Sequence, residues 1–86
     1  MKIDIDQDDF GTLCICAIRY CMGRQTYMPD LVRGIVRQYL AELSDRDIKV
    51  MLDDSKEQWC FGDERIDKPG WLEWRRILEE EVKRRC

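Results

Sequence analysis

The sequence predicts an all-α protein, folded as a compact bundle of about four helices. Apolar residues recur at helical spacing in four segments, and each segment is bounded by residues that begin or end helices. The chain of 86 residues is long enough for one hydrophobic core and too short for two. We therefore expect a single helical domain over residues 1–86, with a short extended segment at 1–7 and helices at about 8–22, 29–40, 45–58 and 69–85.

The first predicted helix is apolar around most of its circumference. Asp8 and Asp9 are expected to cap its start, and Gly23 is placed to end it. Its main apolar stripe comprises Phe10, Leu13, Cys14, Ala17, Ile18 and Cys21, extended sideways by Ile15 and Met22. A helix of this kind is buried on most sides. It is therefore expected to be either the central helix of the bundle or part of an interface between copies of the chain.

The other three helices have clear start signals. Pro29 suits the first turn of the second helix, Ser44 with Asp47 forms a near capping box for the third, and Asp67 with Pro69 opens the fourth. The third helix carries one apolar stripe, formed by Ile48, Met51, Leu52, Ser55 and Trp59. The fourth carries Trp71, Trp74, Leu78 and Val82 on one face and ends in Lys83, Arg84 and Arg85. These stripes are expected to meet in the core.

The charge of the chain is unevenly distributed. Its net charge is −3, but residues 18–39 hold four arginines against one aspartate and carry +3, so the remainder carries −6. A basic patch on an acidic body fits a local site for a compact anion, or a surface for self-association, better than a general DNA-binding protein. No apolar run is long enough to span a membrane.

Five cysteines are many for this length. The odd number and the absence of a secretory signal argue against a disulfide framework. The spacing of Cys14, Cys16 and Cys21 within one helix, in a chain without histidine, does not suit a zinc site. We expect reduced, buried thiols that act as small apolar side chains, and no metal or cofactor.

Cationic and aromatic residues gather where the first helix gives way to the second. The candidate ligand-binding residues are Arg19, Tyr20, Arg24, Thr26, Tyr27, Arg33 and Arg37. Guanidinium groups, tyrosine rings and a helix N-terminus together suit a phosphate or a nucleotide. The alternative is structural: Arg19 and Arg24 pair with carboxylates such as Asp63, Asp67 or Asp30, and the tyrosines belong to the core. Arg33 and Arg37 are expected on the polar face of the second helix.

Catalysis has little support in the sequence. There is no histidine, nucleophile elbow or phosphate-binding loop. The neighbouring carboxylates at Asp53–Asp54 and Glu79–Glu81 fall on predicted polar faces, so we expect them to be solvated. Direct DNA binding is not expected, because residues 45–57, the segment that would serve as a recognition helix, contain more acidic than basic residues.

The residues at this junction resemble a known pattern. The segment A-I-R-Y-C-M-G-R-Q-T-Y-M is similar to a motif, A-x-R-Y-x-L-G-R-x-T-Y-x, of small uncharacterised proteins of bacteriophages and prophages. Those proteins also have an acidic third helix and a D-K-P-x-W tail, matched here by residues 67–71. The resemblance runs from about Asp8 to the last helix. Met22 replaces the usual leucine with a side chain of similar volume.

The resemblance implies a phage accessory protein that inhibits bacterial antiviral immunity in the host cytoplasm by binding. One form is a sponge that sequesters an immune nucleotide at the Arg/Tyr cluster as a homo-oligomer. The other is an anti-CRISPR-type inhibitor that docks an acidic face on the basic nucleic-acid channel of a defence effector. That face would comprise Asp45, Asp47, Asp53, Asp54, Glu57, Asp63 and Glu64. The alternative function is a structural or regulatory module of the phage in which the Arg/Tyr cluster only holds the bundle together.

Overall fold

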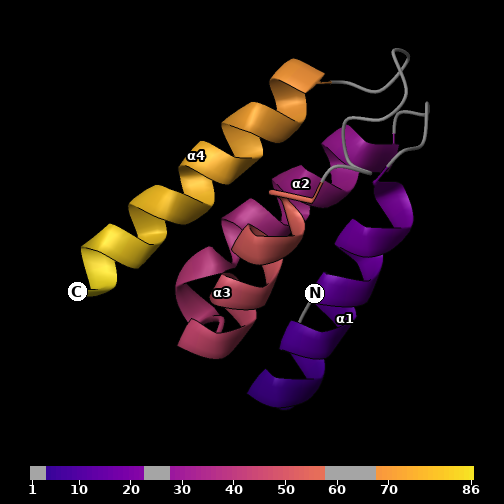
Figure 1. Cartoon of the computed structure of the whole chain (residues 1–86). Coiled ribbons are helices and arrows are strands. Elements are labelled where there is room, and N and C mark those ends of the chain that lie inside the picture. Colours follow the sequence, from indigo (N-terminus) through magenta and orange to yellow (C-terminus); the bar gives the residue numbers. More distant parts are fainter. Residues whose placement is uncertain (1–3, 23–27, 58–67) are drawn as a thin grey trace.

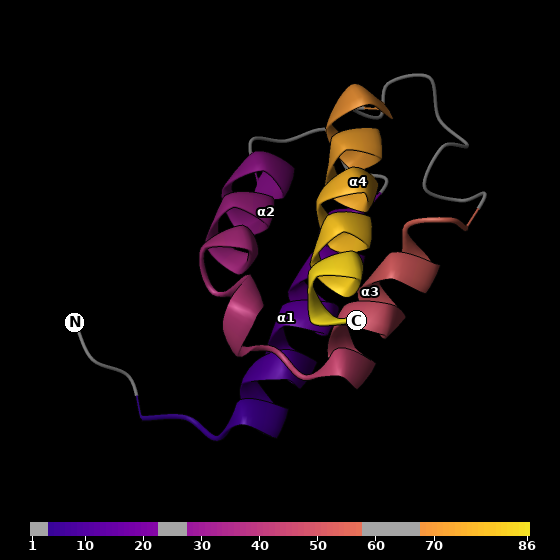
Figure 2. The same cartoon turned by 90° about the vertical axis from the view of Figure 1, so that its left-hand side faces the viewer.

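A computed structural model describes residues 4–22, 28–57 and 68–86, and this part of the chain is all-α. The elements are α1 (Gln7–Cys21), α2 (Met28–Gln38), a short 3-10 helix η1 (Leu40–Glu42), α3 (Asp45–Asp54) and α4 (Lys68–Arg85). Helices α1 and α4 lie on opposite sides of the bundle, with α2 and α3 between them (Figure 1, Figure 2). Helix α1 packs against α2 and α3, and α3 packs against α4. The predicted all-α bundle of about four helices is confirmed.

The first helix starts one residue earlier than the sequence predicts. The side chain of Asp6 accepts a hydrogen bond from the Asp8 backbone N–H at 3.2 Å, so Asp6 is the cap and α1 begins at Gln7. Asp8 and Asp9 lie in the first turn, where their charge favours the positive end of the helix. The predicted end at Gly23 lies outside the described residues.

The other predicted helix starts are confirmed where the structure describes them. The hydroxyl of Ser44 accepts a hydrogen bond from the Asp47 N–H at 3.2 Å and caps α3. Pro29 and Pro69 lie in the first turns of α2 and α4, where a missing N–H costs little. The predicted cap Asp67 lies outside the described residues.

Helix α3 ends earlier than the periodicity suggests. The Ser55 hydroxyl donates a hydrogen bond to the Leu52 carbonyl at 2.6 Å, and Arg75 of α4 donates one to the Ser55 carbonyl at 2.7 Å. In a continuing α-helix the Leu52 carbonyl would accept from the Lys56 N–H. The Lys56 and Glu57 N–H groups bond instead to the carbonyls of Asp53 and Asp54, so the last turn tightens and α3 stops at Asp54.

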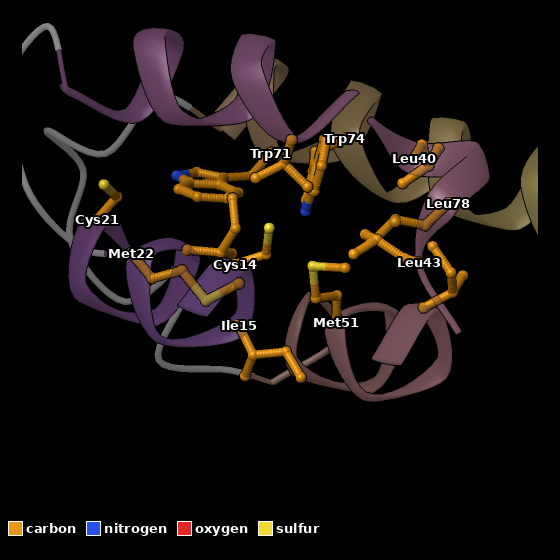
Figure 3. Close-up of a cluster of buried hydrophobic side chains, with 13 residues drawn as sticks. Cys14, Ile15, Cys21, Met22, Leu40, Leu43, Met51, Trp71, Trp74 and Leu78 are labelled. Atoms are coloured by element: carbon orange, nitrogen blue, oxygen red, sulfur yellow. The ribbon is translucent and has the colours of Figure 1, made fainter. Parts of the chain in front are cut away.

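The core is formed mainly by α1, α3 and α4. Trp71 and Trp74 occupy the middle of the buried cluster, with Cys14 of α1 and Met51 of α3 close by (Figure 3). The predicted stripes are confirmed for the buried residues Ile48, Met51, Ser55, Trp71, Trp74 and Leu78. Leu13, which the sequence places in the buried stripe of the first helix, is exposed. It lies toward the edge of that stripe, and neither α2 nor α3 covers it.

One carboxylate predicted on an acidic surface is in fact buried. Asp47 lies in the first turn of α3, packed against Gly11 of α1. A Cβ atom built on Gly11 would lie 2.6 Å from Asp47 Cγ and closer still to its Oδ2. The absence of a side chain at Gly11 therefore allows the two helices to approach each other here.

A second carboxylate predicted to be solvated, Glu81, is also buried. Arg84 donates a hydrogen bond to it at 2.6 Å, and Arg85 Nε lies 3.8 Å from its Oε2. Arg85 also donates to Asp45 at 2.8 Å and to the Leu40 carbonyl at 2.9 Å. The last turn of α4 is thereby tied to η1 and to the start of α3.

The burial and pairing of Glu81 predict a pH effect on stability. The hydrogen bond from Arg84 holds the pKa of Glu81 below its usual value of 4.5. A depressed carboxylate pKa contributes stability that is present above about pH 4.5 and is lost as the pH falls through the folded-state value. Between about pH 6 and pH 3, the melting temperature of the native protein is therefore expected to fall more steeply than that of Glu81→Gln. Equal slopes would contradict this assignment.

Candidate binding surface

The predicted ligand-binding residues do not form one cluster in the described chain. Arg24, Thr26 and Tyr27 lie outside the described residues. Arg19 faces α3, Arg33 and Arg37 face α4, and Tyr20 is exposed on α1. Only Arg33 and Arg37 are brought together, along one side of α2.

Arg19 is paired within the chain. Its Nε donates to Asp54 Oδ2 at 2.6 Å and its Nη2 donates to Asp54 Oδ1 at 3.2 Å, a bidentate contact between α1 and α3. This hydrogen-bonded pair raises the pKa of Arg19, so the guanidinium stays charged. Arg19 therefore pairs with a carboxylate of the chain, as the structural alternative predicts. Its partner, however, is Asp54 and not Asp63, Asp67 or Asp30.

Arg33 is not on a polar face as predicted. Its side chain is only 8% exposed, and its guanidinium lies 4.5 Å from the ring centroid of Trp71. It also donates a hydrogen bond to Asp30 at 2.7 Å. A guanidinium is weakly hydrated and stacks on aromatic faces, and this allows it to be buried against the α4 indole.

Arg37 lines a cavity of about 220 Å³ between α2 and α4. The cavity is lined by two arginines and two carboxylates, Arg33, Arg37, Asp30 and Glu73, together with Gly34, Gly70, Trp74 and Ile77. A hydrogen bond from Arg76 lowers the pKa of Glu73, with a smaller contribution from the nearby Arg37, so this carboxylate is charged at neutral pH. The four ionised groups balance, and the cavity has no net positive charge to attract an anion.

The structure describes five residues of the predicted acidic face, and they do not form a continuous acidic surface on α3. Asp63 and Glu64 lie outside the described residues, and Asp47 is buried. Asp45 and Asp54 are in ion pairs with Arg85 and Arg19. The remaining acidic residues, Asp53 and Glu57, share the exposed surface with the basic residues Arg46, Lys49 and Lys56. Lysines and arginines at the intervening helical positions therefore interrupt the acidic pattern.

An exposed apolar surface lies instead on the outer side of α1 and α2. It comprises Leu13 and Tyr20 of α1 with Leu31, Ile35 and Tyr39 of α2 and its end, each between 41% and 58% exposed. The two halves adjoin where the rings of Phe10 and Tyr39 meet edge to face, with their centroids 5.8 Å apart. We call these five residues the α1/α2 face. All five are large apolar or aromatic residues.

The sequence carries a signal for the α2 half of this face in the spacing of its apolar residues. Leu31, Ile35 and Tyr39 are spaced four apart, so they share one side of a helix. Val36 and Leu40, which are buried, form a second apolar side. A short helix that is apolar on two sides has a second surface available for contact.

The cysteines differ in their surroundings. Cys14 and Cys21 are buried, as predicted. Cys16, which is not part of the predicted apolar stripe, is exposed, and so is Cys86, so the expectation of buried thiols does not hold for these two. These four described cysteines are free thiols. Cys60 lies outside the described residues. Burial, with the nearby Asp47 carboxylate, raises the pKa of Cys14, so its thiol is kept protonated and unreactive.

Among the described residues, no group of three or more cysteine or carboxylate side chains is placed to hold a metal ion. None of the described helices has the length and apolar character needed to cross a bilayer. No family model, curated protein or solved structure matches the chain.

Proposed function

We propose that the chain is a non-enzymatic binding protein that docks on a bacterial antiviral effector and inhibits it in the host cytoplasm. The observation that carries this proposal is the uncharged α1/α2 face. Large exposed apolar side chains that adjoin one another are characteristic of protein–protein contact surfaces. The sequence resemblance supports the phage context, and the exposed apolar surface supports docking on a protein as the mode of action.

Docking on a protein is better supported than capture of an immune nucleotide. Capture would require free guanidinium groups, but Arg19 and Arg33 contact carboxylates of the chain itself. These two residues are better explained by the alternative in which they hold the bundle together. Cyclic di- and trinucleotides are therefore expected to leave the melting temperature unchanged, because a ligand raises it only by binding the folded state.

A phage-challenge screen tests the proposal directly. The gene would be expressed in cells that each carry one defence system, and plaque formation would be compared with an empty vector. Rescue of phage growth is expected in one such strain. Ile35→Glu places a charge on the α1/α2 face and is expected to abolish rescue, since a buried unpaired charge is costly.

The matched control for this variant is Leu72→Glu. Leu72 is an equally exposed leucine on α4, away from the α1/α2 face, so the same change of charge there is expected to leave rescue intact. No rescue in any strain, or equal effects of the two variants, would contradict the proposal. Circular dichroism of both variants checks that each remains folded.

Self-association is the second candidate use of this surface. An uncharged apolar face on a small domain also suits pairing with a second copy. Light scattering across a range of concentrations tests it, with Ile35→Glu as the variant expected to shift any dimer to monomer. If the chain is a monomer at all concentrations, self-association is excluded and the α1/α2 face is available to a different protein.

A further inference from the structure

We propose that the α1/α2 face receives a basic amphipathic helix of the partner protein, with the cationic end of that helix over the start of α1. This inference rests on the proposed docking function and specifies the chemistry of the partner. It follows from the distribution of charge around the face: its five residues are uncharged, and it is bordered at the start of α1 by exposed acidic residues.

One line of exposed residues runs along α1 and changes character on the way. Asp6, Asp9, Leu13, Cys16 and Tyr20 follow one another at intervals of three or four, so they lie along one side of the helix and its cap. All five are exposed. The line is acidic at Asp6 and Asp9 and uncharged from Leu13 onward, so it favours a partner whose charge lies at one end.

Further acidic groups lie at the same end. The Gln7 side chain donates a hydrogen bond to the Glu42 carbonyl at 2.7 Å, which places exposed Glu42 beside the start of α1. The contact between Phe10 and Tyr39 lies in this region and joins the acidic end to the apolar surface. Residues 4–18 contain no lysine or arginine. In the described chain, Asp6, Asp9 and Glu42 form no ion pair, so their charge is available to a partner.

The dimensions of the line fit a short helix. From Asp9 to Tyr20 the rise is about 17 Å, at about 1.5 Å per residue. A partner helix of about three turns matches this length and presents anchors at positions i, i+3 or i+4, and i+7. Its lysines or arginines would lie one turn beyond its apolar anchors.

A second copy of the chain fits the charge pattern less well. The exposed positions of its own α1/α2 face are uncharged, and the line that borders them begins with aspartates. Pairing two such faces places no described lysine or arginine of the same line against Asp6 and Asp9. A cationic helix supplies the missing complement, and charge complementarity at an interface favours specific partners.

Binding of two designed peptides tests the inference. One is a fluorescently labelled helical peptide of about eighteen residues, with leucine anchors spaced i, i+4 and i+7 and with its lysines confined to the terminal turn beyond those anchors. The other has glutamate in place of every lysine. Fluorescence anisotropy with the full chain is expected to show binding of the lysine peptide at least tenfold tighter than that of the glutamate peptide. Ile35→Glu is expected to weaken lysine-peptide binding at least tenfold, and Leu72→Glu less than twofold.

A pair of charge variants separates local complementarity from net charge. Asp6→Asn with Asp9→Asn keeps a capping side chain at residue 6, because asparagine caps as well as aspartate. It is expected to weaken lysine-peptide binding about three- to tenfold and to reduce its salt dependence. Asp53→Asn with Glu57→Gln removes the same charge from exposed positions at α3 and is expected to change binding less than twofold.

Three results would overturn the inference. They are equal binding of the two peptides, equal effects of the two charge variants, and an Ile35-dependent dimer of the native chain that excludes the lysine peptide. These measurements do not depend on the phage screen. If the peptide assay fails but the phage screen shows rescue, only the basic-helix partner is rejected. If the peptides are discriminated but the phage screen shows no rescue, only the antiviral role is rejected.

Discussion

Replacing Leu78 with alanine is expected to lower the free energy of unfolding by about 3–4 kcal/mol. Leu78 is fully buried in the core that α4 closes (Figure 3). The substitution removes apolar burial and leaves a cavity that the surrounding helices fill only in part. Since a small domain is stabilised by about 5–10 kcal/mol in total, the loss is a large fraction of its stability. Urea unfolding followed by circular dichroism measures it.

The same substitution at Leu72 is the matched control. Leu72 lies on the same helix but is 52% exposed. Leu72→Ala is therefore expected to change the free energy of unfolding by no more than about 0.5 kcal/mol. Similar losses for the two variants would mean that α4 does not present Leu78 to the core.

Gly11→Ala is expected to destabilise the fold by about 1–3 kcal/mol, although alanine is the better helix former. The added methyl group would overlap the buried Asp47 carboxylate, so α1 and α3 would have to move apart or Asp47 would have to leave its position. Thermal and urea unfolding of the variant measure the cost. A variant as stable as the native chain would contradict the close contact.

Two controls isolate the role of that contact. Gly34→Ala is the same change in a helix interior where nothing lies within 4 Å of the added methyl group. It is expected to raise stability by about 0.5–1 kcal/mol. In a double-mutant cycle, Gly11→Ala and Asp47→Ala together are expected to cost less than the sum of the single variants, because truncation of Asp47 makes room for the methyl group. Additive costs would place the strain elsewhere.

The helices could be predicted because their signals are local. Ser44 caps α3, Pro29 and Pro69 lie in first turns, and the stripe of Trp71, Trp74 and Leu78 faces the core. Each of these depends on residues within one or two turns. The end of α3 was not predicted, because the apolar stripe continues past it, whereas the Ser55 hydroxyl bonds to the Leu52 carbonyl and the next N–H groups form tighter bonds.

Burial of charged side chains could not be read from periodicity. Arg33, Asp47 and Glu81 all occupy positions that a polar residue type assigns to solvent, yet each is buried. In each case a specific neighbour allows it: the Trp71 ring, the bare backbone at Gly11, and the arginines of the last turn. Such neighbours are known only once the helices have been placed.

The described residues of the candidate site do not form one cluster, for a related reason. Arg19 and Tyr20 are adjacent in sequence, but successive helical residues point about 100° apart, so one faces α3 and the other lies on the outer surface. Residues that are adjacent in the sequence therefore point to different surfaces of the bundle. The α1/α2 face, by contrast, joins residues of two helices and appears only when these are packed together.

The largest side chains of the core come from α4, which follows the other helices in the described chain. Trp71 and Trp74 both belong to it, so α1, α2 and α3 are synthesised before the side chains that fill the space between them. A helix pair or triplet without its main packing partner is marginally stable in water. The core is therefore expected to close only after α4 has been synthesised, and a chain cut short before α4 is expected to expose apolar surface and to aggregate.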